Sequence, residues 1–189
     1  ERIEINDDES TDHFENIQST NWQTVRWKPP PAGAPLTGDK HIGWRTEFRS
    51  MEVQLTDFEN AAFTVLVVLL SRVILYYDLN LYMPLSQVDE NMRRAHKRDA
   101  INTQKFWFRQ TVMPKVSERQ SRDGCNSCGG DLSLQELSIS EILQGKGEFR
   151  GLVPMIMAYL DMIDTDTNTM NMVCNYFQFI CARAAGGLL

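Results

Sequence analysis

An apolar segment in the first half of the chain, residues 57–77, constrains the fold most. Placed on a helix, it is apolar on nearly every side, and Thr56 and Glu59 match a capping box at its start. In this motif the threonine hydroxyl accepts from the Glu59 N–H, while the glutamate side chain returns to the backbone of Thr56. A helix that is hydrophobic all round must be surrounded by other elements. We therefore expect a fold built around residues 57–77.

The uncharged length of this segment separates a core helix from a membrane span. Its longest uncharged stretch, residues 61–71, has 11 residues and ends at Arg72. A helix needs about 20 apolar residues to cross a bilayer. The acidic N-terminus also lacks the apolar region of a signal peptide. These features predict a buried core helix and no membrane partner.

The rest of the pattern predicts a mixed chain of strands and helices that is mostly helical towards its C-terminus. Strand-like residues at 24–27 and 44–55 flank an exposed proline-rich loop at 28–43. A second polar loop is expected at 114–133. Further helices are expected over residues 86–110, 134–144, 153–163 and 167–185, the first opened by Ser86 and the last followed by Gly186.

Two other patterns have ordinary structural explanations. The glycine-rich run at residues 145–151 lacks the spacing of a phosphate-binding loop, so we expect a turn and a helix cap there. Basic residues recur between Arg93 and Arg109. Such a run is usually a solvated helix face, which is the interpretation we adopt.

The second predicted strand has one charged face. Because alternate side chains of a strand point to opposite sides, Arg45, Glu47 and Arg49 share one face, and Trp44 and Phe48 share the other. With its apolar face buried, the strand would present either a solvated charged row with cross-strand ion pairs or an anion and metal site. In the second case Glu47 would hold Mg²⁺ and an arginine would grip a phosphate, an arrangement that suits phosphoryl transfer.

Charge and cysteine content argue against two other classes of protein. The formal net charge is −6, whereas nucleic-acid-binding domains are usually basic. Residues 1–12 hold six acidic residues and one basic residue, and we expect a flexible acidic lead-in. Cys125 and Cys128 form a CxxC motif, but zinc needs four ligands, and Cys174 and Cys181 lie on a predicted core face. We expect no zinc, no nucleic acid and a reducing, cytoplasmic location.

Several motifs occur in an order that resembles the catalytic (heavy) subunits of eukaryotic glutamate–cysteine ligases. They are HFENIQSTNWQ at 13–23, KPP at 28–30, GWRTEFR at 43–49, MEVQLTDFEN at 51–60, PLS at 84–86 and VDENM at 88–92. The resemblance extends weakly to about residue 183. Members of that family are considerably longer. Residues 13–189 would therefore be an incomplete, C-terminal part of the catalytic domain, which agrees with a chain that starts at Glu1.

The resemblance implies a fold, a reaction and site residues. The fold would be α+β, part of a glutamine-synthetase-like antiparallel sheet with a mostly helical C-terminal portion. The reaction would join L-glutamate and L-cysteine through a γ-glutamyl phosphate, with ATP and Mg²⁺, in the first step of glutathione biosynthesis. Glu47 would bind the metal and Arg49 the transferred phosphate or the glutamyl group. Trp22 would form a wall of the substrate pocket, and Arg45 would also bind substrate.

Two functions follow from this resemblance. The chain would supply part of a ligase site and be inactive alone, because other metal-binding carboxylates of the family lie in an N-terminal part that these residues do not include. Alternatively, it would be a truncated, non-catalytic module that binds a partner such as the modifier (regulatory) subunit.

Overall fold

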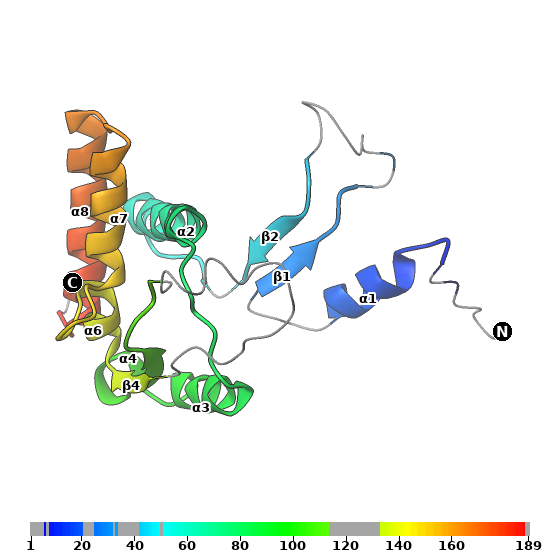
Figure 1. Cartoon of the computed structure of the whole chain (residues 1–189), viewed down its shortest axis with the longest axis horizontal. Helices are drawn as coiled ribbons and strands as arrows, with labels where there is room; N and C mark the ends of the chain where they lie inside the picture. Colours follow the sequence, from blue (N-terminus) through cyan, green and yellow to red (C-terminus); the bar gives the residue numbers. More distant parts are fainter. Residues whose placement is uncertain are drawn as a thin grey trace. The chain divides into compact units, whose positions relative to one another are not determined.

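The chain divides into two units in the computed structural model, residues 1–54 and residues 55–189. The structure describes residues 6, 8–20, 25–31, 33, 42–49, 51–113 and 133–187. Figure 1 shows its helices and strands in chain order. Each unit is described by itself.

The first unit contains a helix and a pair of strands in its described part. Helix α1 (Asp12–Thr20) begins where the Ser10 hydroxyl accepts from the Asp12 N–H at 3.1 Å. Strands β1 (Val25–Lys28) and β2 (Arg45–Phe48) are antiparallel. The strand expected at 24–27 is thus confirmed within one residue. Helix α1 was not expected from the sequence.

The second strand is shorter than predicted. Only four of the twelve residues at 44–55 belong to β2. The register pairs Val25 with Phe48, so a longer β2 would need strand partners before Val25, and residues 21–24 lie outside the described part.

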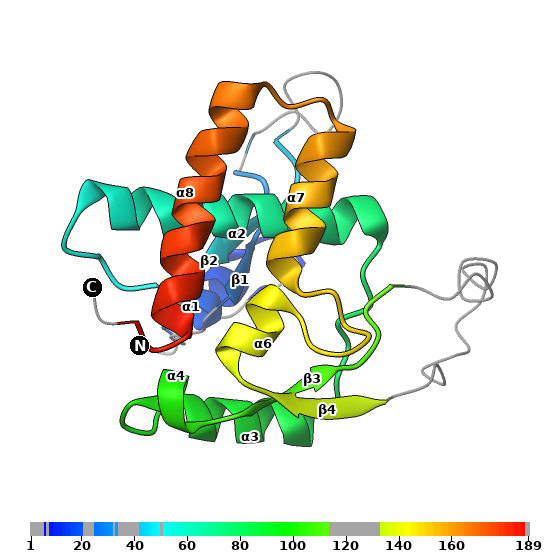
Figure 2. The ribbon, with the colours of Figure 1, turned by 90° about the vertical axis from the view of Figure 1, so that its left-hand side faces the viewer.

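The second unit opens with the helix that the sequence placed at its centre. Helix α2 (Asp57–Tyr77) is preceded by the predicted capping box, in which Glu59 N–H donates to Thr56 Oγ1 at 3.2 Å and Thr56 N–H donates to Glu59 Oε2 at 2.9 Å. It ends at Asp78, which adopts the left-handed conformation. Two further helices, α7 (Leu152–Met162) and α8 (Thr167–Ala184), lie across α2 (Figure 2).

The helix predicted over 86–110 is wrong beyond its first half. Helix α3 (Leu85–Ala95) begins after Pro84 rather than at Ser86, and a short helix α4 (Ala100–Thr103) follows it. The chain then forms strand β3 (Phe106–Arg109). Its aromatic residues fit a pleated, half-buried surface better than they fit an exposed helix.

The helix predicted over 134–144 is likewise only half right. Strand β4 (Leu134–Leu137) pairs antiparallel with β3, and helix α6 (Ile139–Gln144) starts at a second capping box, formed by Ser138 and Glu141. The cap at Ser138 divides the segment into a strand and a helix. Residues 114–132, most of the predicted polar loop, lie outside the described part.

The last two helices confirm their predictions within one residue. After α8, Gly186 has a φ of +81°, Gly187 N–H donates to Ala182 O at 2.9 Å and Gly186 N–H to Arg183 O at 3.2 Å. This pair of bonds is a Schellman motif, with the glycine at the left-handed position as predicted. The run at 145–151 forms the expected turn, in which Lys146 pairs with Phe149 and Gly151 caps α7.

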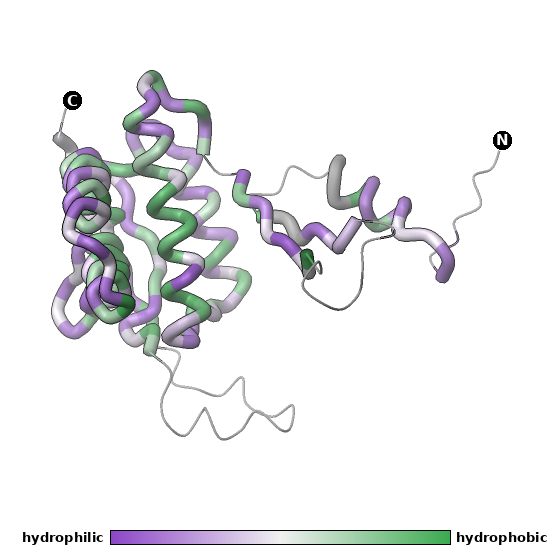
Figure 3. Tube along the Cα trace, turned by 90° about the horizontal axis from the view of Figure 1, so that it is seen from above, coloured by the Kyte–Doolittle hydropathy of each residue, from purple (hydrophilic) through white to green (hydrophobic). Residues whose placement is uncertain are grey.

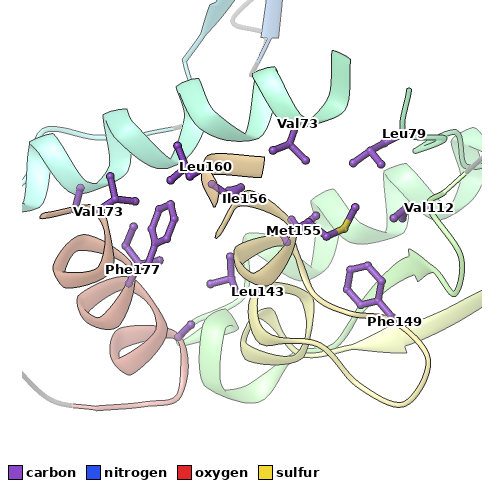
Figure 4. Close-up of a cluster of buried hydrophobic side chains, with 14 of the residues drawn as sticks. Val73, Leu79, Val112, Leu143, Phe149, Met155, Ile156, Leu160, Val173 and Phe177 are labelled. Carbon is purple, nitrogen blue, oxygen red and sulfur yellow. The ribbon is translucent and has the colours of Figure 1, made fainter. Parts of the chain in front are cut away.

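The described hydrophobic core lies in the second unit. Figure 4 shows Val73 on α2 pointing towards Ile156 and Leu160 of α7, with Val173 and Phe177 of α8 in the same cluster. Helix α2 therefore takes part in the core as predicted. Only two of its residues, Ala62 and Val73, are buried, so α2 lies at the side of the core rather than inside it.

Helix α2 is long and apolar enough to cross a membrane by length and composition, because it continues through Arg72. The prediction that this segment is too short to cross a bilayer, made from the 11 uncharged residues at 61–71, is therefore wrong. Core helices of soluble proteins pass the same test, so one such helix is weak evidence for a membrane span.

Candidate functional site

The Glu47 carboxylate is held between two cations on strand β2. Lys28 Nζ lies 2.7 Å from Glu47 Oε2, and Arg49 Nη2 donates to Glu47 Oε1 at 2.7 Å. The Glu47 side chain is 27% exposed, and the two cations are more exposed than it is. Pairs with this much solvent contribute little stability, about 0–1 kcal/mol each. The cluster is therefore better explained by the charge it concentrates than by its effect on folding.

The strand register brings these groups together. Lys28 is the Cα partner of Arg45 in the antiparallel pair, and Glu47 is two residues further along the same strand as Arg45. Residues two apart on a strand share a face, so the lysine reaches Glu47 diagonally. Arg45 donates instead to the carbonyl oxygen of Pro29 at 3.1 Å. The charged row predicted on one face is present, and Lys28 is added to it.

The opposite face of β2 is open, which corrects the prediction that it is buried. Trp44 is 59% exposed and Phe48 is 47% exposed. The described part of the first unit has one helix and two strands, and a two-stranded ribbon cannot bury a face by itself. The cross-strand ion pair between Lys28 and Glu47 fits the solvated alternative, and the clustering of Lys28 and Arg49 around one carboxylate, with Arg45 on the same strand face, fits an anion site.

A complete metal site is absent from the described residues. They contain no group of three or more histidine, cysteine, aspartate or glutamate side chains that could hold a metal ion. Mg²⁺ prefers about six oxygen ligands. Glu47 therefore fits as one ligand of a site completed by other oxygens, such as those of bound phosphates or of other parts of a longer chain.

Three residues singled out from the sequence lie outside the described part, namely Trp22, Cys125 and Cys128. Their roles stay predictions.

Cys174 and Cys181, both on α8, are free thiols and half-buried, in keeping with the expected core face. Burial raises the pKa of the Cys181 thiol.

A family model described as glutamate–cysteine ligase matches residues 1–189. The chain belongs to the glutamate–cysteine ligase family. Its similarity to individual members is high. It is 47% identical to the catalytic subunit of Homo sapiens over 100% of this chain and 29% of that protein. It is 45% identical to the ligase of Schizosaccharomyces pombe (95% and 25%) and 38% identical to that of Saccharomyces cerevisiae (95% and 26%).

The resemblance drawn from the ordered motifs is thus confirmed. The chain spans 29% of the length of the human ligase subunit it matches, as expected for part of a longer enzyme of this family. No solved structure matches. The fold is established as mixed helix and strand, and its relation to glutamine synthetase stays a prediction.

Lys28 belongs to the charged cluster around Glu47, and the sequence reasoning missed it. The sequence pattern places it in the proline-rich loop because Pro29 and Pro30 follow it. The signal that could have identified it is its position as the last residue before the prolines. A strand can reach that residue, and a proline ends the ladder after it.

The basic run in the second unit is partly structural rather than solvated. Arg94 donates to Glu136 at 2.5 Å, to Glu90 at 3.0 Å and to the carbonyl oxygen of Lys105 at 2.7 Å. These bonds tie α3 to the strand pair of β3 and β4. Arg109 is buried and donates to the carbonyl oxygen of Tyr82 at 3.0 Å. The prediction of a solvated face is wrong for Arg94 and Arg109 and right for residues 93, 97 and 98, which are exposed.

Proposed function

We propose that this chain is part of an ATP-dependent glutamate–cysteine ligase. The observation that carries the proposal is the family match over residues 1–189, which includes the charged strand β2. The relatives bear the name glutamate–cysteine ligase, which describes an enzyme that joins L-glutamate and L-cysteine. The product would be γ-glutamylcysteine, made in the first step of glutathione biosynthesis, and the location cytoplasmic.

The proposed reaction activates a carboxylate before an amine attacks it. An oxygen of the glutamate γ-carboxylate takes the γ-phosphoryl group of ATP, and ADP leaves. The cysteine amine then attacks the carbonyl carbon of the γ-glutamyl phosphate, nitrogen loses a proton and phosphate leaves. Positioning and neutralisation of charge supply most of the catalysis in phosphoryl transfer.

The cations beside Glu47 suit the anionic groups of this reaction. Arg49 is proposed to contact the transferred phosphate or the glutamyl group, since a guanidinium can bind a phosphate with two parallel hydrogen bonds. Arg45 and Trp22 are proposed to bind substrate. Positive charge placed where negative charge develops stabilises the transition state. The close approach of Arg49 to Glu47 keeps the guanidinium on this face of β2.

Glu47 is proposed as one ligand of Mg²⁺. Its carboxylate supplies the hard oxygen donor that this ion prefers. When bound, the ion would neutralise charge on the phosphates. Lys28 and Arg49 restrict where the carboxylate lies, and the remaining ligands would come from other parts of a family-length chain. There, β1 and β2 would form part of a larger glutamine-synthetase-like antiparallel sheet.

Replacing the proposed metal ligand tests this function. In a family-length ligase that carries these 189 residues, Glu47→Gln keeps the size of the side chain and removes its negative charge. We expect kcat to fall about 100-fold or more, because a charge-stabilising contact is lost at the transition state. We also expect half-maximal activity to need more Mg²⁺. The measurements are steady-state kinetics at several Mg²⁺ concentrations.

A matched control separates the loss of the Glu47 carboxylate from an effect of the substitution on folding. Glu52 is exposed and lies beyond the end of β2, so Glu52→Gln makes the same chemical change outside the cluster. The control should keep its activity, and both variants should keep the circular dichroism spectrum of the parent. Near-parental activity of the Glu47 variant would contradict the proposed role.

A second candidate is a non-catalytic module that binds a partner subunit. The exposed Trp44 and Phe48 on the open face of β2 favour it, since exposed aromatic residues are common in protein interfaces. The two candidates differ in a simple assay. We expect the isolated 189-residue chain to show no ATP turnover with glutamate and cysteine. Binding of a purified modifier subunit, lost in Trp44→Ala, would support the module.

A further inference from the structure

One side of helix α2 is an exposed row that the second unit leaves uncovered. Thr64, Val68, Arg72 and Leu75 are exposed and follow one another at intervals of four, four and three residues, which places them on one side of the helix. We call this row the outer stripe. Val68 is 54% exposed and Leu75 is 77% exposed.

The other side of α2 faces the core. Ala62 and Val73 are fully buried, and α8 and α7 pack against the helix on that side. In Figure 4, Val73 points from α2 into the cluster of buried side chains. An amphipathic surface helix would carry polar residues on its far side. Helix α2 is instead coloured as hydrophobic along most of its length (Figure 3).

Two hydroxyl groups on this side of α2 bond to the backbone of the helix itself. Thr64 Oγ1 donates to Asn60 O at 2.8 Å, and Ser71, which neighbours Arg72, donates to Val67 O at 2.8 Å. These hydroxyls therefore do not depend on water for a partner. Arg72 has no ion-pair partner among the described residues. The outer stripe thus combines an apolar surface with one cation. It suits an interface without water in which the covering surface is apolar and supplies one carboxylate to pair with Arg72.

Three occupants of the outer stripe can be compared. A lipid bilayer is disfavoured because it would surround Arg72 with hydrocarbon, which is costly for a charge, and because α2 already packs on protein. A second copy would bring two Arg72 side chains close together, and the stripe has no carboxylate to neutralise them. Of these three, the occupant that remains is polypeptide of a family-length ligase outside these 189 residues, since the chain spans 29% of the human relative.

We infer that, in a ligase of family length, the outer stripe of α2 is covered by polypeptide outside these 189 residues, through an apolar surface that places a carboxylate against Arg72. The inference rests on membership of the family and not on the roles proposed for Glu47 and Arg49. A family-length enzyme that is inactive at Glu47 would still cover the stripe.

Cysteine labelling tests the inference site by site. Val68→Cys and Leu75→Cys are made in the isolated chain and in the human catalytic subunit whose matching segment has been replaced by this chain. A charged maleimide reports exposure, and peptide mass spectrometry separates these sites from the native cysteines. Gln178→Cys, at an exposed position on α8, is the control.

In the isolated chain, all three sites should react at similar rates. In the family-length protein, we expect the labelling rates at the two stripe sites to be at least about tenfold lower than in the isolated chain. The labelling rate at the control site should be the same in both proteins. Equal rates in both proteins would overturn the inference. Protection of the stripe sites in the isolated chain that grows with its concentration would also overturn the inference, because it assigns the stripe to a second copy. Flotation of that chain with phosphatidylcholine–phosphatidylserine vesicles would overturn it as well, because it assigns the stripe to a membrane.

Two further measurements keep the inference testable. Arg72→Glu should lower the unfolding temperature of the family-length protein more than Arg72→Gln does, and the two variants should be equal in the isolated chain. If the hybrid protein does not fold, the remainder of the human subunit can be expressed separately and mixed with this chain. Binding that Val68→Asp weakens supports the inference, and absence of binding contradicts it.

Discussion

At the residue scale, two glutamates with similar ionic partners differ in what surrounds them. Glu47 lies on a two-stranded ribbon whose far face is open, and its cations are exposed. Glu90 pairs with Arg94, which also bonds to Glu136 and to a backbone carbonyl and lies over the Trp107 ring. The second network joins three elements and is structural. Among the described residues, the ion pairs of Glu47 join residues of one ribbon, and the partial exposure of these side chains suits contact with a ligand.

The structural carboxylates predict how the stability of the second unit depends on pH. The Arg94 guanidinium lowers the pKa of Glu90, and Lys146, with the Ser138 N–H, lowers the pKa of Glu141, both from an ordinary value of 4.5. Each therefore stabilises the fold fully above its unfolded pKa, and this contribution is lost as pH falls through the folded pKa. We expect the unfolding temperature to fall as the pH drops below about 4.5.

Neutral variants check this pH dependence. The double variant Glu90→Gln with Glu141→Gln should have a lower unfolding temperature than the parent near pH 7. On acidification, its unfolding temperature should fall by fewer degrees than that of the parent. Glu148→Gln, at an exposed position in the turn before α7, is the control. The assignment is wrong if the double variant and the parent lose the same number of degrees between neutral and acidic pH.

At the element scale, local signals identified the helix ends and missed the second strand pair. The capping box at Thr56 and the glycine after α8 act within a few residues, so the sequence predicts them well. Strand β3 has no such signal. Its partner β4 follows after the 19 residues at 114–132. The pairing places Phe106 opposite Leu137, and both side chains are buried. The capping box at Ser138 could have corrected the helix predicted over 134–144.

The glycines around the α6–α7 turn give a prediction at this scale. Gly151 has a φ of +87°, and a Cβ there would lie 2.4 Å from Gln144 C and Gly145 N. We expect Gly151→Ala to lower the free energy of unfolding by about 2–4 kcal/mol, from backbone strain and the clash together. Urea denaturation followed by circular dichroism measures it.

Gly147 separates the two causes. It also has a positive φ, +59°, but a Cβ there would meet nothing within 4 Å. Gly147→Ala should therefore cost only the conformational part, about 1–2 kcal/mol. An equal loss in both variants would mean that the close backbone approach at Gly151 adds nothing.

At the scale of the whole molecule, the chain has two units, and the described hydrophobic core lies in one of them. The cluster of buried hydrophobic residues runs from Ala62 to Ala184 and lies in the second unit. The described part of the first unit contributes no residue to it. Stability should therefore reside in residues 55–189, and the ribbon that carries Glu47 should gain its rigidity in a longer protein.

A truncation tests this division. Residues 55–189 expressed alone should remain folded, with the same urea midpoint as the 189-residue chain. Trp107 is the only tryptophan in that segment, so its fluorescence reports the second unit. An unfolded or aggregated segment, or a clearly lower midpoint, would show that residues 1–54 are needed for the core.

The sequence by itself determined the helices with strong local signals, the charged row on β2 and the family. Those features depend on residues within a few positions of one another, or on motifs in a fixed order. Only the tertiary structure decided that Lys28 joins Glu47, that β3 pairs with β4, that Arg94 and Arg109 are structural, and that the described part of the second unit leaves one side of α2 uncovered. Each of these depends on which segments distant in sequence pack together, and local propensity does not encode that choice.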